Sequence, residues 1–291
     1  MSSNWSGSRP SQSSAEILPP ESRANPGSYP GGRMAGYDGD PGPLRPSPSR
    51  RAGGTRWASA PATYILVGIN CAVYVAMVIH GVSPNHPNQD QLIQFGANSV
   101  QKVLVEGEWW RLLTAAFVHI GFLHLATNMW CLWNLGLLGE PLLGPAGLLA
   151  VYVLTGVAGN LLSTVVNSAN LDMVGAGASG AVFGLAGVLI LLLKAKLLPV
   201  PSGEIHRLRR SVIYFALLNF VIGGTTMFIP TSIRIDNMAH LGGFLCGLAL
   251  GVPLVPRIGA AKSEFVFRSW AAYGVMTVLL LAFAYGVARP R

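Results

Sequence analysis

Seven stretches of apolar sequence, each close to the length that crosses a bilayer, limit what this chain can fold into. They lie at residues 62–82, 122–139, 146–167, 177–197, 211–230, 238–256 and 270–288. About 20 apolar residues in a helix span the hydrocarbon core of a membrane. Lipid offers the backbone no hydrogen-bond partners, so each spanning run must be helical. The chain is therefore predicted to be an all-α membrane protein in contact with the lipid bilayer.

The composition agrees with a lipid environment. Of the 291 residues, 51% are hydrophobic and 11% are charged, whereas a soluble domain carries about 25% charged residues. A net charge of +8 would suit a nucleic-acid-binding protein. The basic residues lie in the gaps between apolar runs, however, so no nucleic acid is expected as a partner. Cys71, Cys131 and Cys246 each fall inside an apolar run and are expected to pack as small apolar residues.

Residues 1–60 differ from the rest of the chain. They are rich in Gly, Pro, Ser and Arg and lack apolar periodicity, a composition typical of a disordered tail. A short apolar stretch near Met1 is missing, so no signal peptide is expected.

The placement of Lys and Arg predicts an orientation. If all seven runs span, one side holds the seven Arg of the tail, five basic residues within 194–210 and three within 257–268. The other side holds Lys102, Arg111, Arg234, Arg289 and Arg291. The positive-inside rule then places the N-terminus in the cytoplasm and the C-terminus outside. Many Arg and few Lys, with abundant Ala and Gly, indicate a bacterial source, so a bacterial cell membrane is the expected location.

Residues 83–118 form a connection on the outer side that is long for a loop. A loop of this length is either functional or disordered. It contains Trp109, Trp110 and an apolar stretch at 112–118. Because Trp is enriched where membrane meets water, we expect the loop to lie in the interface.

Gly177-Ala178-Ser179-Gly180 opens the fourth run. Glycines on both sides can hold a serine on a tight turn and leave an amide N–H free to bind an oxyanion. The same small residues also allow helices to pack closely. On this motif alone, a catalytic serine and a packing motif both remain open.

His240 stands in the sixth run, followed by Gly243 and Gly247. The two glycines, four residues apart, give a smooth helix face on which a neighbouring helix can pack. His240 could then meet a residue of that neighbour. A neutral imidazole can take a serine proton and later return it, although a buried histidine can also be purely structural.

His124 and Asn128 are four residues apart at the start of the second run, so they share a helix face. Both side chains can donate hydrogen bonds, which suits an oxyanion hole. His119 points elsewhere or precedes the helix. A zinc site is the alternative, but the H-E-x-x-H pattern is absent and carboxylates nearby are few, so no metal is expected. A nucleophile, a base and oxyanion donors on three outer-side runs together indicate acyl transfer.

In this combination the sequence resembles the rhomboid family of intramembrane serine proteases. The family's motifs are Trp110-Arg111 in the long loop, His119, His124 and Asn128 in the second run, Gly177-Ala178-Ser179-Gly180 in the fourth, and Ala239-His240 with Gly243 and Gly247 in the sixth. Glu140 stands where the family tends to place an acidic residue at the inner end of the second span. The resemblance covers about 62–256.

Beyond the tail at 1–60, the resemblance implies a catalytic core of six transmembrane helices at 61–256 around a water-filled cavity open to the outside. A linker and an added seventh helix follow at 257–291. Ser179 would attack the peptide carbonyl of a transmembrane protein substrate and form an acyl-enzyme, with His240 as base and then acid. The implied oxyanion donors are the Ser179 backbone N–H, His124 and Asn128. Supporting positions are His119, Gly177, Gly180, Trp110, Arg111 and Phe183. No cofactor is implied.

Phe183 and Asp236 both lie close in sequence to the proposed dyad. Phe183 stands where many relatives carry a Tyr that packs on the catalytic histidine, and a small effect on His240 is expected. Asp236 precedes His240 by four residues and could suggest a triad, but the family uses a dyad, so we interpret Asp236 as a loop or helix-cap residue.

Two other functions fit a membrane chain of this kind. A non-proteolytic rhomboid relative that binds membrane proteins would typically lack the serine or the histidine, and both are present. A transporter often shows an internal repeat, and none is evident. The oligomeric state and the substrate are not predictable from the sequence.

Overall fold

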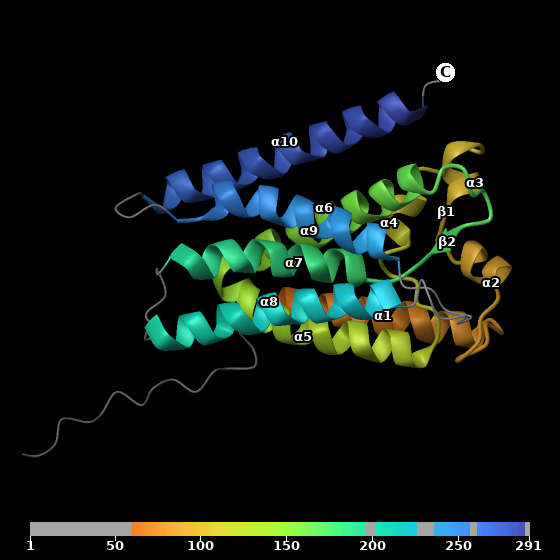
Figure 1. The fold of residues 1–291 in the computed structure, drawn as a ribbon, viewed down its shortest axis with the longest axis horizontal. Coiled ribbons are helices and arrows are strands. Elements are labelled where there is room, and N and C mark those ends of the chain that lie inside the picture. The colour runs from red at the N-terminus through yellow and green to blue at the C-terminus, as the bar shows by residue number, and fades with distance from the viewer. Residues whose placement is uncertain (1–59, 196–201, 226–235, 257–260, 289–291) are drawn as a thin grey trace, which may run out of the picture. The chain divides into compact units, whose positions relative to one another are not determined.

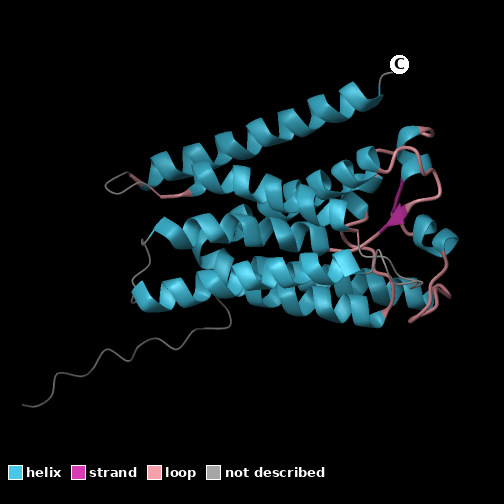
Figure 2. Ribbon diagram, viewed as in Figure 1, coloured by secondary structure: helices cyan, strands magenta, loops and turns pink. Residues whose placement is uncertain are grey.

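The computed structural model describes residues 60–195, 202–225, 236–256 and 261–288, and most of them are helical (Figure 2). This confirms the predicted all-α class. The long helices are α1 (Pro61–Ile79), α5 (Phe122–Leu143), α6 (Pro145–Val166), α7 (Ser179–Leu192), α8 (Ser202–Thr225), α9 (Asn237–Leu254) and α10 (Lys262–Ala288). Apart from Ala60, the predicted tail lies outside the described residues.

Each long helix coincides with one predicted run, but several ends differ. Helix α8 begins nine residues before the predicted 211, and α10 begins eight residues before the predicted 270. Both extensions are polar and charged, so a search for apolar runs passes over them although they continue the helix. Helix α7 begins at Ser179 instead of 177 because Gly177 has a φ of 132°, which a helix cannot contain.

Four described helices are long and apolar enough to cross a membrane by themselves: α1, α6, α9 and α10. Helix α7 is apolar but has only 14 residues and continues into the short helix η2 (Leu193–Ala195). Helices α5 and α8 carry more polar residues. The count of seven crossings therefore stays a prediction.

Helices α6, α7 and α9 pack side by side (Figure 1), and glycines bring their backbones together. A Cβ added at Gly243 of α9 would overlap the Gly180 carbonyl oxygen of α7. One turn further on, a Cβ at Gly247 would overlap the Gly184 carbonyl oxygen. The predicted small-residue face of α9 is thus confirmed as a helix contact.

Helix α10 packs on the outside of α6 and α9 (Figure 1). Its buried residues are Ser269 and Tyr273. The Tyr273 hydroxyl approaches Gly147 at the start of α6, where an added Cβ would lie 3.0 Å from it. Most of the remaining α10 surface is apolar and exposed, as expected for a helix that faces lipid.

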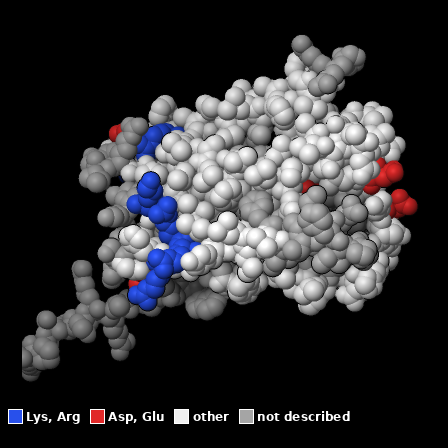
Figure 3. Space-filling view, in the orientation of Figure 1, with Lys and Arg blue, Asp and Glu red and all other residues white. Residues whose placement is uncertain are grey.

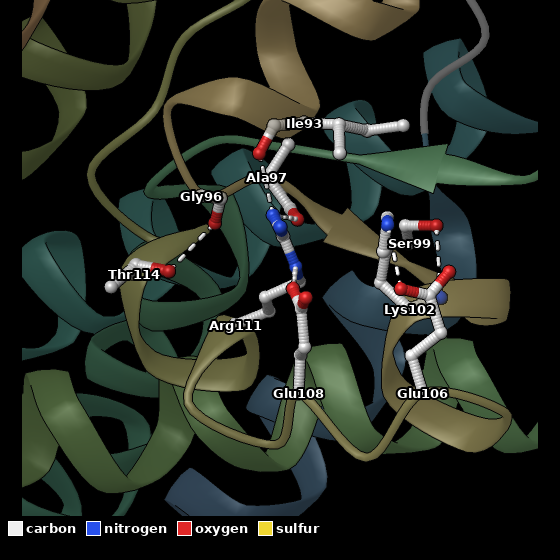
Figure 4. Close-up of polar contacts among 9 residues, drawn as sticks. All are labelled: Ile93, Gly96, Ala97, Ser99, Lys102, Glu106, Glu108, Arg111 and Thr114. Carbon is white, nitrogen blue, oxygen red and sulfur yellow. Dashed lines mark hydrogen bonds and ion pairs between the residues drawn. The ribbon is translucent and has the colours of Figure 1, made fainter.

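The long loop is ordered within the described residues. It contains α2 (Gln89–Gln94), β1 (Asn98–Ser99), α3 (Val100–Leu104) and α4 (Arg111–Thr114). The side chain of Arg111 links several parts of this loop (Figure 4). Its Nη1 donates hydrogen bonds to the carbonyl oxygens of Ile93 (2.6 Å) and Ala97 (3.2 Å), and its Nε donates to Glu108. The guanidinium also lies 4.5 Å from the ring of Trp110, which is half exposed.

Two long-range polar contacts tie distant segments together. Strand β1 pairs antiparallel with β2 (Val174–Gly175), directly before the fourth predicted span. Glu140, near the end of α5, accepts hydrogen bonds from the Ala62 and Thr63 amides, each 2.8 Å, and from the Thr63 hydroxyl. These amides belong to the first turn of α1, whose N–H groups have no partner within the helix.

Basic side chains gather at one end of one face of the molecule (Figure 3). On the face shown in Figure 3, the Lys and Arg side chains gather at one end, and the end that carries β1 and β2 in Figure 1 shows only acidic ones. Acidic side chains are also visible at the basic end in Figure 3, and Lys102 and Arg111 lie in the long loop with β1, so the separation of charge is partial. The orientation of the termini itself stays a prediction.

Candidate active site

The turn before α7 positions Ser179. Strand β2 leads into Gly177, whose positive φ of 132° reverses the chain and whose amide donates to the Ala115 carbonyl oxygen at 2.9 Å. Ser179 follows as the first residue of α7. The β1–β2 pairing and the Ala115 contact therefore fix the residues that lead into Ser179 to the long loop.

His119 supports the same turn from the side. It is fully buried, and its Nε2 accepts a hydrogen bond from the Ala178 amide at 3.4 Å. Its other ring nitrogen lies 3.3 Å from the Phe117 carbonyl oxygen, an acceptor, so the proton belongs on Nδ1. His119 precedes α5, as predicted, and contacts the residue next to Ser179.

His124 and Asn128 lie on one face of α5, as their spacing predicts. The Ile120 amide lies 3.3 Å from His124 Nδ1, which assigns the ring proton to Nε2. That side of the ring lies against Gly177: a Cβ there would be 2.6 Å from His124 Cε1 and 3.0 Å from Nε2. Any side chain at position 177 would therefore collide with His124.

Asn128 is buried, and its amide nitrogen donates to the His124 carbonyl oxygen at 2.9 Å. An amide nitrogen carries two hydrogens, so this bond uses only one of them. The contact holds the side chain along α5 and leaves the second N–H for another acceptor. Both predicted donors therefore lie in the first two turns of α5.

The start of α7 adds backbone donors. The first N–H groups of a helix have no carbonyl partner within it, and the helix dipole favours negative charge there. For α7 these include the amides of Ser179, Gly180 and Ala181, since the Val182 amide is the first to bond back, to Ala178. An anion at this end would meet several N–H groups.

His240 lies in the first turn of α9 and is buried. The Phe183 ring stacks on its imidazole, with centroids 4.3 Å apart and planes inclined by 15°. Phe183 follows Ser179 by four residues and so lies one turn along the same face of α7. The Ala239 carbonyl oxygen, next to His240, abuts Gly180, where an added Cβ would be 3.3 Å away. The starts of α7 and α9 are thus in contact.

Asp236 is the N-cap of α9: Oδ1 accepts from the Ala239 amide at 2.9 Å. Oδ2 accepts from the Ser163 hydroxyl of α6 at 2.5 Å. The interpretation as a helix cap is confirmed. The tie to Ser163 was not foreseen, because no local pattern indicates which residue of α6 faces the start of α9.

Trp110 and Arg111 lie in the long loop and organise it, and neither belongs to the cluster around Ser179. Asn98 links that loop to α6 through its amide, which donates to Asn160 O (3.2 Å) and Thr164 Oγ1 (3.0 Å). Within the described residues, no group of three His, Cys, Asp or Glu is placed to hold a metal ion.

A family model described as Rhomboid domain matches residues 106–257, more than half of the chain. The chain belongs to the rhomboid family. The matched segment runs from the long loop through α9 and contains every predicted site residue. Membership, with several apolar helices of spanning length, makes this a multi-pass membrane protein.

Among known rhomboid proteins, the chain is similar to Rhomboid protease GluP of Bacillus subtilis (strain 168), with 30% identity over 77% of this chain and 39% of the relative. RHOMBOID-like protein 5 of Arabidopsis thaliana is 34% identical over 57% of this chain and 51% of its own length. Rhomboid protease AarA of Providencia stuartii is 30% identical over 66% of this chain and 72% of its own length. The chain thus spans about half or less of the first two relatives.

Proposed function

We propose that this protein is an intramembrane serine endopeptidase that cleaves peptide bonds in or near transmembrane segments of other membrane proteins. Two of the relatives are named rhomboid proteases. The observation that carries the proposal is the contact between the starts of α7 and α9, where Phe183 stacks on His240 one turn from Ser179. A serine and a histidine on adjoining helix starts are the parts that acyl transfer requires.

In this mechanism the Ser179 hydroxyl attacks the substrate carbonyl carbon while His240 takes its proton. The tetrahedral intermediate then expels the amine of the new N-terminus, which receives that proton from the imidazolium. The carbonyl stays on Ser179 as an ester, the acyl-enzyme. A water molecule, deprotonated by His240, attacks the ester, and the carboxylic acid product and the free serine are released.

The oxyanion of each intermediate would lie at the start of α7. Its donors are the Ser179 N–H, the Nε2–H of His124 and the second N–H of Asn128. The hydrogen bond from Ile120 to His124 Nδ1 keeps the ring in the tautomer that donates from Nε2. Donors fixed before the reaction lower the barrier because they need no reorganisation as charge develops.

The test needs no substrate. Detergent-solubilised protein is treated with a fluorophosphonate serine probe, and the unmodified chain is compared with Ser179→Ala and His240→Ala. We expect labelling of the unmodified chain and its loss in both variants. Thermal denaturation should show that all three proteins are folded. Labelling that persists in Ser179→Ala would assign the reactive serine elsewhere.

A folded unmodified chain that takes up no label under any condition would favour the alternative, a rhomboid relative that binds membrane proteins without cleaving them. A cleavage assay on reconstituted membrane-protein candidates then separates the two functions. The binding function predicts association without new peptide termini.

A further inference from the structure

The carboxylate of Asp236 touches three segments that meet at the site. Its Oδ1 caps α9 through the Ala239 amide, and its Oδ2 accepts the Ser163 hydroxyl of α6. A Cβ added at Gly175 would lie 3.2 Å from Oδ2, so the carboxylate also borders β2, which leads into the Ser179 turn. One side chain thus contacts the helix of the base, a neighbouring helix and the approach to the nucleophile.

Ser163 belongs to a polar cluster at the end of α6. It is fully buried, and the adjacent Thr164 bonds to Asn98 of β1 at 3.0 Å. Nearby, the Asn160 amide donates to the Leu112 carbonyl oxygen at 2.8 Å. The end of α6 is therefore fixed to the long loop, and Asp236 extends this fixed point to α9.

We propose that Asp236 is a positioning residue, which sets the place of His240 against Ser179 by fastening the start of α9 to Ser163 of α6 through hydrogen bonds. The inference rests on the proposed function. It assigns to Asp236 no contact with substrate and no place in a triad. A histidine in the first turn of a helix moves with that turn, and a cap decides how the turn is held.

The hydrogen bonds of Asp236, and not its charge, are what the site uses. Burial raises the pKa of this carboxyl above its ordinary value, although the bonds from Ser163 and the α9 amides oppose that shift. The charged form is therefore less favoured here than in water. Asn has the same shape, accepts at the cap as well as Asp does, and can donate its amide hydrogen to Ser163.

The experiment compares Asp236→Ala, Asp236→Asn and Ser163→Ala in the full chain, by the rate of fluorophosphonate labelling across a range of pH. Asp236→Ala should slow labelling by about tenfold, the order of effect of one lost helix cap. Asp236→Asn should stay within about twofold of the unmodified chain with the same pH profile. Ser163→Ala should slow labelling by about threefold, since the cap remains and only the tie to α6 is lost.

Asn88→Ala is the matched control. Asn88 caps α2 through the Gln91 amide, at 2.8 Å, and its side chain is exposed. Loss of that cap should leave the labelling rate unchanged. If Asp236→Ala does not fold, Asp236→Asn and Ser163→Ala still decide the matter.

Two results would overturn the inference while leaving the proposed function intact. One is labelling of Asp236→Ala, or of Ser163→Ala, at the unmodified rate. The other is Asp236→Asn labelling at a much lower rate or with a shifted pH profile, which would assign the role to the charge. Failure of the proposed function looks different, because then the unmodified chain itself takes up no label.

Discussion

Helices α6 and α10 are both apolar and long enough to cross a membrane, yet they differ in how much of their surface is buried inside the protein. In α6, 61% of the spanning window is buried inside the protein, and in α10 only 6%. Their mean hydropathies, 1.8 and 1.9, are nearly equal. Hydropathy therefore indicates that a helix can enter the membrane, but not whether protein or lipid will surround it.

Glycine placement marks the difference. Along α9, which packs against α6 and α7, Gly243 and Gly247 have no room for a Cβ, whereas Gly274 and Gly286 of α10 have nothing within 4 Å. The inner helices are fixed by backbone contact, and the outer one rests on a few side chains. The residues proposed for catalysis, Ser179 and His240, lie on helices that are fixed by backbone contact.

Replacing Gly243 by Ala should have the largest effect. The new methyl group would meet the Gly180 carbonyl oxygen, a backbone atom that cannot rotate away. We expect a loss of about 3 kcal/mol or more in the free energy of unfolding and no fluorophosphonate labelling. Thermal denaturation measures the loss of stability, and the fluorophosphonate probe measures the loss of labelling.

Gly274→Ala is the matched control in α10. It should be neutral or raise stability by up to about 1 kcal/mol, because Ala favours the helix over Gly. If both substitutions destabilise equally, the distinction between inner and outer helices is wrong.

Asn128→Ala should lower the rate of cleavage or labelling by about 10²- to 10³-fold at most, the usual loss for one oxyanion donor. Asn134→Ala on the same helix is the control. Asn134 also donates to the carbonyl oxygen four residues earlier, at 2.6 Å, but it is exposed. Its loss should leave the rate within about twofold, since surface substitutions change little. Equal rates in the two variants would remove Asn128 from the oxyanion hole.

Phe183→Tyr should have the smallest effect. The added hydroxyl leaves the ring stacked on His240, so the labelling rate should change by no more than a few-fold, about 1 kcal/mol in the barrier. Phe283→Tyr, on the exposed face of α10, should change nothing measurable. Labelling abolished by Phe183→Tyr, in folded protein, would mean that the stacking geometry tolerates no polar atom beside His240.

Much of this fold could be predicted from apolar length alone. The run at 146–167 corresponds to α6 within one residue at each end, and 238–256 corresponds to α9 within two. The polar start of α8, beginning at Ser202, was missed because apolar runs report burial in lipid and not helix length. The short elements of the long loop were missed for the same reason.

The sequence predicted which candidate residues share a helix face, but not which distant residues bond to one another. Spacing placed His124 and Asn128 on one face, and the glycines of α9 indicated a helix contact. The bond between His119 and the Ala178 amide joins residues 59 apart, and the bond between Ser163 and Asp236 joins residues 73 apart. Such pairs depend on tertiary packing, and no local pattern reports them.

The contact of α9 with both α6 and α7 has a consequence for biosynthesis. A ribosome completes α6 and α7 before it has made α8 or α9, so Ser179 is made well before His240. Under the proposed mechanism, His240 reaches its place only when the glycine face of α9 packs against α7, so an unfinished chain would lack its base. The proposed activity would then arise at one late step of assembly, when α9 joins the helices made before it.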